Sequence, residues 1–322
     1  MKVECSNECL STEDIIILSE INRYKKEILM KIIEGYMPYL EYKTYYRIVG
    51  ECTGNNKPLV LLHGGPGSTH NYFEVLDKIA EGGHSVIMYD QLGCGLSATP
   101  SRPDLWKAET WIEELIELRK HLKLDEIHLL GQSWGGMQAI QYACQYKPKG
   151  IKSYILSSTL PSASLWEKEQ RRRVAYLPKE MQEAIAKAEK TGDYSSSEYK
   201  EAEEEFMIRH CSGEIEPDSP ECLRRAKVSG RESYITAWGQ NEFSPSGTLR
   251  NFEFIKEIED IKEPCLIISG LLDLCTPLVA KTMYDRIPNS EWGLFEFSRH
   301  MPFVEENEKY IEILNKWLKE HS

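Results

Sequence analysis

The sequence predicts an α/β fold with a mostly parallel central sheet, and two patterns carry this prediction. Short, almost uninterrupted apolar runs alternate with helical stretches, as expected for strands that are buried on both faces of a parallel sheet. These runs lie at residues 59–62, 85–89, 127–130, 151–157, 265–269 and 292–297. By contrast, residues 162–245 are charge-rich, helical in pattern and free of such runs, which predicts an inserted helical cap over one edge of the sheet.

The segment ahead of the first buried run contains a further helix and strands. Residues 12–33 place apolar side chains at three- and four-residue steps, which predicts an amphipathic helix that packs as an appendage, or alternatively forms a lid or a dimer contact. Residues 39–49 alternate and are rich in Tyr and Ile, as in strands. We therefore expect a helical extension over residues 1–35, an α/β core from residues 36–161 and 246–322, and a cap over residues 162–245.

Composition narrows the classes of partner. The chain has 322 residues, 41% of them apolar, which is enough for a substantial core. Its net charge of −12 repels nucleic-acid phosphates and anionic lipid heads, so neither partner is expected. The first residues lack the apolar core of a signal peptide, and no run approaches the roughly 20 apolar residues of a membrane span. We expect a soluble, cytoplasmic protein.

The cysteines and histidines argue against a metal or other cofactor. Nine scattered cysteines, an odd number, fit a reducing compartment, and neither C-x-x-C nor H-E-x-x-H occurs. Residues 93–98 formally match a dinucleotide-binding motif, but the prolines within residues 99–103 prevent the helix that must hold the pyrophosphate. No cofactor is expected.

A nucleophile motif follows the run at residues 127–130. Residues 131–136 read Gly-Gln-Ser-Trp-Gly-Gly and precede a helical pattern at residues 137–146. G-x-S-x-G between a strand and a helix is typical of a nucleophile elbow, in which a sharp turn with glycine on both sides places the serine at a helix N-terminus. We therefore predict that Ser133 is the catalytic nucleophile.

A glycine-rich loop, residues 63–67, follows the first buried run. In proteins with such an elbow, this loop donates one backbone N–H to the oxyanion and the residue after the nucleophile donates another. Gly65 and Trp134 are the expected oxyanion donors. Gly64, in the same loop, is an expected substrate contact.

A catalytic serine also needs a base and an acid, which enzymes with this elbow take from later strand ends in the order acid, then histidine. Asp273 and His300 each follow a buried run, in that order after Ser133. Asp90 and Asp260 are discounted because Asp90 precedes the serine and Asp260 precedes its strand. The prediction is therefore that His300 is the base and that Asp273 orients it.

With these residues located, residues 36–320 resemble the proline iminopeptidase family of α/β-hydrolases. That family includes prolyl aminopeptidases, the tricorn-interacting aminopeptidase and amino-acid amide hydrolases. The segments that carry the resemblance are residues 63–67, 89–97, 131–136, 238–243 and 247–249. The resemblance implies an α/β-hydrolase fold with a cap, and a serine hydrolase that releases an N-terminal residue, often proline, from short peptides or amides through an acyl-enzyme.

The resemblance also implies acidic residues that bind the substrate amine. Glu242 matches one of them. A second glutamate typically follows the triad acid in family aminopeptidases, but this chain has Leu274 there. Another cap acid could take its place, the candidates being Glu214, Glu216 and Glu221.

Two other functions remain open on the sequence. An ester or lactone hydrolase could use the same triad, and it would be indifferent to blocking of the substrate amine. A ligand-binding protein on an inactive hydrolase fold is the non-enzymatic alternative, and the complete set of nucleophile, base, acid and oxyanion loop argues against it. The sequence does not indicate an oligomeric state.

Overall fold

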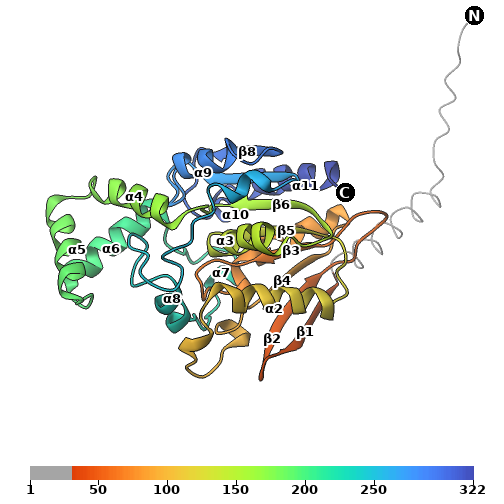
Figure 1. Cartoon of the computed structure of the whole chain (residues 1–322), viewed down its shortest axis with the longest axis horizontal. Helices are drawn as coiled ribbons and strands as arrows, with labels where there is room; N and C mark the ends of the chain where they lie inside the picture. The colour runs from red at the N-terminus through yellow and green to blue at the C-terminus, as the bar shows by residue number, and fades with distance from the viewer. Residues whose placement is uncertain (1–30) are drawn as a thin grey trace, which may run out of the picture.

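The computed structural model describes residues 31–322 (Figure 1). Most of the helix expected over residues 12–33, and of the extension expected over residues 1–35, lies outside the described residues. The prediction of a helix is wrong for the last residues of the range 12–33, because β1 (Ile32–Tyr39) begins there. This strand pairs antiparallel with β2 (Tyr42–Val49), from Ile32 opposite Val49 to Tyr39 opposite Tyr42. The adjacent isoleucines at the start of β1 fit either secondary structure, and pairing with β2 decides in favour of the strand.

The sheet has eight strands within residues 31–322, in the order β1-β2-β4-β3-β5-β6-β7-β8. Strands β1, β2 and β4 pair antiparallel, and all pairs from β4 to β8 are parallel. The mostly parallel α/β sheet predicted from the apolar runs is thereby confirmed. The remaining strands are β3 (Leu59–Leu62), β4 (Val86–Tyr89), β5 (Ile127–Gln132), β6 (Ile151–Ser157), β7 (Cys265–Gly270) and β8 (Ser290–Phe295).

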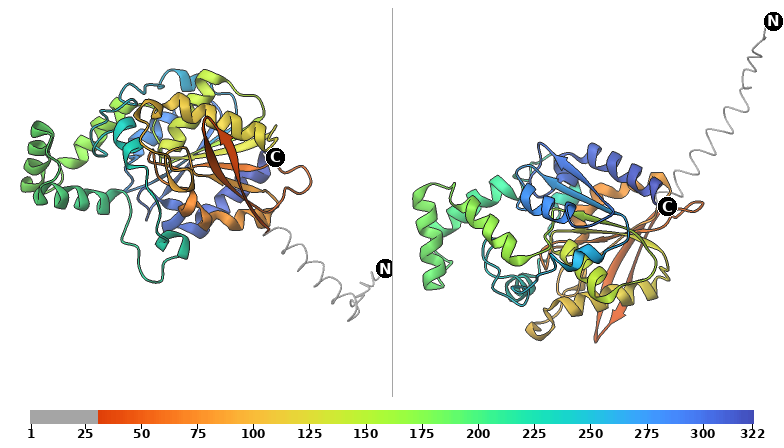
Figure 2. Two further views of the ribbon diagram at one scale, coloured as in Figure 1. Left: turned by 90° about the horizontal axis from the view of Figure 1, so that it is seen from below. Right: turned by 45° about the horizontal axis from the view of Figure 1, so that its top comes forward.

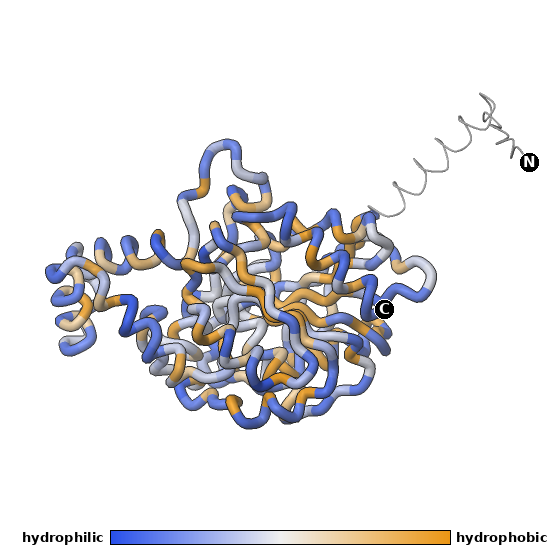
Figure 3. The backbone as a smooth tube through the Cα atoms, turned by 90° about the horizontal axis from the view of Figure 1, so that it is seen from above, coloured by the Kyte–Doolittle hydropathy of each residue, from blue (hydrophilic) through white to orange (hydrophobic). Residues whose placement is uncertain are grey.

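Helices cover both faces of this sheet, and the side chains of the central strands divide between two cores. Val60 and Leu62 pack on one face with α2, α3 and α9, whereas Leu59 and Leu61 pack on the other with η1 and α11. Figure 3 shows the apolar residues concentrated along the central strands. The elements involved are η1 (His70–Gly82), α2 (Ala108–His121), α3 (Trp134–Gln141), α9 (Pro277–Tyr284) and α11 (Asn307–Glu320). Shorter elements are η2 (Gly95–Ser97), η3 (Pro103–Leu105), η4 (Tyr142–Tyr146), η5 (Glu257–Asp260) and α10 (Pro302–Glu305).

The connection between β6 and β7 carries a separate group of helices, which we call the cap. Helices α4 to α6 project away from the sheet in every view of Figures 1 and 2, whereas α7 and α8 lie closer to the body. The cap helices are α4 (Ala163–Val174), α5 (Lys179–Thr191), α6 (Ser197–His210), α7 (Glu221–Arg224) and α8 (Arg231–Ala237). Within residues 31–322 there is no helix with the length and apolar character needed to cross a membrane.

Candidate active site

Ser133 lies at the sharp turn between β5 and α3, with φ 55° and ψ −119°. Glycines make this turn possible. A Cβ atom at Gly131 would lie 2.2 Å from the carbonyl oxygen of Gly135, and one at Gly135 would lie 2.0 Å from the carbonyl oxygen of Leu62. The turn therefore packs directly against β3 and places Ser133 at the N-terminus of α3.

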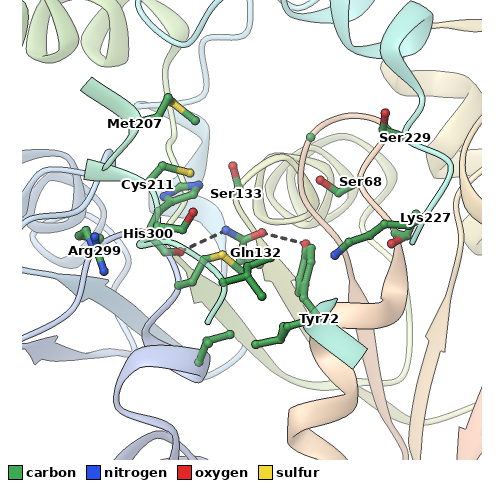
Figure 4. Close-up of a pocket in the computed structure, with 18 of the residues that line it drawn as sticks. Ser68, Tyr72, Gln132, Ser133, Met207, Cys211, Lys227, Ser229, Arg299 and His300 are labelled. Atoms are coloured by element: carbon green, nitrogen blue, oxygen red, sulfur yellow. Dashed lines mark hydrogen bonds between the residues drawn. The ribbon is translucent and has the colours of Figure 1, made fainter. Parts of the chain in front are cut away.

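A cavity of about 820 Å³ opens above Ser133, between the sheet and the cap (Figure 4). Of the residues predicted from the sequence, Ser133, His300, Gly65 and Glu242 line it directly, as does Glu214, one of the three alternative cap acids. The cap contributes part of the wall through α6, α8 and the segment between them, so both layers enclose the space above the nucleophile.

Asp273 lies behind His300 and is fully buried. His300 Nδ1 lies 2.6 Å from Asp273 Oδ1. Two backbone amides hold the carboxylate in place: Cys275 N–H donates to Oδ1 at 2.7 Å and Gly270 N–H donates to Oδ2 at 3.1 Å. With Nδ1 engaged, Nε2 is the imidazole nitrogen left for chemistry in the cavity, where Figure 4 shows His300 beside Ser133.

The backbone N–H groups of Gly65 and Trp134, the two expected oxyanion donors, are free of protein acceptors among the described residues, whereas that of Gly64 is not. Among the described residues, neither the Gly65 nor the Trp134 backbone N–H donates to a protein acceptor, and Trp134 is the first residue of α3. The Gly64 N–H, however, donates to the Tyr72 hydroxyl at 2.5 Å, and Gly64 is buried behind the cavity wall. The structure therefore leaves Gly65 and Trp134 available to an oxyanion and does not bring Gly64 to the substrate side.

Gln91, which sequence reasoning did not single out, links both oxyanion-donating segments. Its Oε1 accepts from Trp134 Nε1 at 2.8 Å, its Nε2 donates to the His63 carbonyl at 3.2 Å, and its backbone N–H donates to His63 Nε2 at 3.0 Å. Burial lowers the pKa of His63 to about 4, so the ring stays neutral and can accept this bond. Gln91 lies within the motif at residues 89–97, but nothing in that motif indicates its partners.

A second hydrogen-bonded chain joins the oxyanion loop to the histidine loop. The Tyr72 hydroxyl, which accepts from Gly64, donates to Gln132 Oε1 at 2.9 Å. Gln132 Nε2 then donates to the His300 carbonyl at 3.3 Å, as the dashed lines in Figure 4 show. The side chain that precedes the nucleophile thus spans the floor of the cavity and fixes the two loops relative to Ser133.

Two cap carboxylates line the cavity, Glu214 and Glu242. Glu242 Oε1 accepts from the Tyr234 hydroxyl at 2.7 Å. Burial raises the pKa of Glu242, an effect partly offset by the Tyr234 hydrogen bond and by the charge of nearby His300. Leu274 is only 1% exposed and does not line the cavity, so the position after Asp273 faces the protein interior in this chain.

The other two cap acids considered as amine ligands, Glu216 and Glu221, are exposed like Glu214 but, unlike it, do not line the cavity. Glu221 instead forms an ion pair with Arg225. Of the three alternatives that the sequence offered, only Glu214 is in a position to contact a ligand above Ser133.

Comparisons with known proteins agree with this geometry. Residues 57–307 match the family described as the alpha/beta hydrolase fold. The crystal structure of VinJ superposes with a TM-score of 0.82 at 32% identity, covering 90% of this chain and 99% of that one. The crystal structure of a proline iminopeptidase from Mycobacterium smegmatis gives a TM-score of 0.79 at 28% identity, covering 90% and 98%. The chain is a hydrolase of the α/β-hydrolase family.

Curated relatives define the family more narrowly. A proline iminopeptidase from Clostridium botulinum is 86% identical over 292 residues, which are 91% of this chain and 100% of the relative. One from Clostridioides difficile is 71% identical over 289 residues, covering 90% and 99%. The chain belongs to the proline iminopeptidase family, which confirms the resemblance seen in its motifs.

Proposed function

We propose that the protein releases an N-terminal amino acid, with proline as the preferred residue, from short peptides or amino-acid amides. The observation that carries the proposal is a single cavity that holds Ser133 and His300 together with two cap carboxylates, Glu214 and Glu242, while the third carboxylate of its wall, Glu305, is paired with Arg299. The proline iminopeptidase names of the relatives support the same substrate class.

The proposed reaction starts with the attack of Ser133 Oγ on the substrate carbonyl carbon while His300 Nε2 accepts the hydroxyl proton. Asp273 keeps the proton of the neutral imidazole on Nδ1 and stabilises the imidazolium that forms. The Gly65 and Trp134 amides donate to the oxyanion. His300 then protonates the leaving amine, and an acyl-enzyme on Ser133 remains for water to hydrolyse with His300 as base.

Recognition of the substrate amine is the proposed role of Glu242 and Glu214. An ammonium group that pairs with carboxylates in a partly desolvated site gains charge-assisted hydrogen bonds. The α-amine is one carbon away from the scissile carbonyl, so this pairing positions the first peptide bond, and no later one, at Ser133. The cavity volume of about 820 Å³ suits a ligand the size of a short peptide.

A panel of prolyl and other aminoacyl arylamides, each with a free and an acetylated amine, tests the proposal. We expect hydrolysis of free-amine substrates only, no turnover by Ser133→Ala, and labelling of the parent protein by a fluorophosphonate at Ser133. Glu242→Gln should raise KM for free-amine substrates, whereas Glu216→Gln, an exposed cap acid, should not. Equal rates on acetylated substrates, or activity on esters and lactones alone, would refute the aminopeptidase assignment and leave a different serine hydrolase.

A further inference from the structure

We propose that Lys227 forms a carboxylate-binding subsite in the cavity and binds the free C-terminal carboxylate of a short peptide substrate. This inference deepens the proposed function and rests on it. Its ligand is the far end of the same substrate whose amine would bind at Glu242.

Lys227 lies in the wall of the cavity that holds Ser133. It belongs to the cap segment between α7 and α8 and lines the cavity together with Ser68 and Ser229. Figure 4 shows its ammonium group pointing into the cavity, on the opposite side of Ser133 from His300. The ammonium of Lys227 and the hydroxyls of Ser68 and Ser229, all in the wall of one cavity, are hydrogen-bond donors of the kind that a carboxylate accepts.

Asp90 and Glu74 are carboxylates whose charges act on Lys227, but neither is close enough to form an ion pair with it. Among residues 31–322, no carboxylate forms an ion pair with Lys227, although Arg225 of the same segment pairs with Glu74 and Arg299, across the cavity, pairs with Glu305. Partial burial of the ammonium lowers the pKa of Lys227, and the charges of Asp90 and Glu74 oppose this effect, while the residue as a whole stays exposed to solvent. A bound carboxylate would give the ammonium the direct ion-pair partner that it lacks among residues 31–322.

Arg231 is another cation on the cavity wall, and its surroundings differ. Its charge lies close enough to Glu203 to lower the pKa of that carboxyl, which burial otherwise raises. Arg231 is therefore partly offset by an acid of the cap. Asp90 and Glu74 act on Lys227 in the same way, but each already binds another residue: Asp90 accepts from the His70 backbone N–H and Glu74 pairs with Arg225. We assign the carboxylate to Lys227, whose ammonium group points into the cavity in Figure 4.

The arrangement predicts selectivity for peptide length. The acids that would bind the amine and the lysine that would bind the carboxylate lie in one cavity with Ser133, and each added residue extends a peptide by at most about 3.6 Å. Only a short peptide can satisfy both ends at once. A prolyl arylamide or a C-terminally amidated peptide lacks the anion and would gain nothing from Lys227.

The test compares Pro-Gly-Gly, its C-terminal amide and a prolyl arylamide as substrates of the full-length chain. We expect Lys227→Met to lower kcat/KM for the free acid about fivefold while the amide and the arylamide stay within about twofold. Lys227→Arg should retain the preference for the acid. Lys179→Met removes the same charge from an exposed site of the cap and should leave all three substrates unchanged. In the parent protein, the preference for the acid should shrink as salt is raised, because Lys227 is exposed to solvent.

An equal loss on the acid and the amide, or an unchanged preference in Lys227→Met, would overturn the subsite while the arylamide activity still supported the proposed function. Absence of Ser133-dependent proline release from every one of the three substrates would instead overturn both. The arylamide therefore separates failure of the subsite from failure of the function on which it rests.

Discussion

Replacement of Gln91 by leucine tests whether the oxyanion site is held by the hydrogen bonds behind it. The substitution keeps the volume of the side chain roughly constant but removes the acceptor of the Trp134 indole N–H and the donor to the His63 carbonyl. Both partner residues are buried, at 1% and 0% exposure, so water cannot replace the lost bonds.

The size of the expected loss of stability follows from the two buried groups left without a hydrogen-bond partner, the Trp134 indole N–H and the His63 carbonyl. A buried polar group without a partner costs about 1–3 kcal/mol, so Gln91→Leu should lower the free energy of unfolding by about 2–6 kcal/mol. Loss of a whole oxyanion donor costs about 10²- to 10³-fold in kcat, and displacement of the two donating segments should cost about 10- to 100-fold. KM should change little, because Glu242 and Glu214 belong to the cap and do not contact Gln91.

Urea unfolding and steady-state kinetics on a prolyl arylamide measure the two effects separately. Gln138→Leu is the matched control, since it removes another fully buried glutamine of the same region, whose Nε2 donates to the Trp111 carbonyl at 2.7 Å. This control should lose stability and keep kcat. If Gln91→Leu behaves like Gln138→Leu, with kcat within twofold of the parent protein, then the bonds to Gln91 serve stability alone and the reasoning is refuted.

Three further predictions concern the elbow, the amine site and a buried acid. Gly135→Ala should destabilise the fold by about 3 kcal/mol or more, seen in thermal unfolding, because its Cβ would lie 2.0 Å from the Leu62 carbonyl oxygen. Burial raises the pKa of Glu242, and the protonated carboxyl cannot pair with an ammonium. KM for free-amine substrates should therefore rise as pH falls through this pKa, and Glu242→Gln should remove the pH dependence. Burial raises the pKa of Glu114 to about 8, so stability from this group should be lost as pH rises from about 5 to 8, by up to about 4 kcal/mol relative to Glu114→Gln in urea unfolding.

The features that could be predicted from the sequence are those that neighbouring residues determine. The elbow depends on glycines two residues on either side of Ser133, and the parallel sheet depends on continuous apolar runs. Asp273 and His300 could be proposed because each follows its own strand, and strand ends of a parallel sheet meet at one edge. The structure places these two side chains 2.6 Å apart, although 27 residues separate them in the chain.

The features that could not be predicted depend on contacts between distant segments. Gln132 and His300 are 168 residues apart, and no local pattern indicates that the amide of one contacts the carbonyl of the other. Gly64 and Gly65 are neighbours in the sequence, but a tertiary contact makes their amides different. The Gly64 N–H donates to the Tyr72 hydroxyl, whereas the Gly65 N–H has no acceptor among the described residues. In the same way, adjacent isoleucines before Tyr36 fit a helix or a strand until β2 pairs with them.

Backbone hydrogen bonds connect the cap to both reacting segments, and this has a consequence for specificity. Gly230 N–H, in the cap, donates to the Gly67 carbonyl of the oxyanion loop at 2.7 Å, and His300 N–H donates to the Cys211 carbonyl of the cap at 3.1 Å. Cap residues that would bind the ends of a substrate are therefore held at fixed positions relative to the oxyanion donors and the base. Binding energy from the substrate ends can then orient the scissile carbonyl, so changes in the cap should lower kcat as well as raise KM.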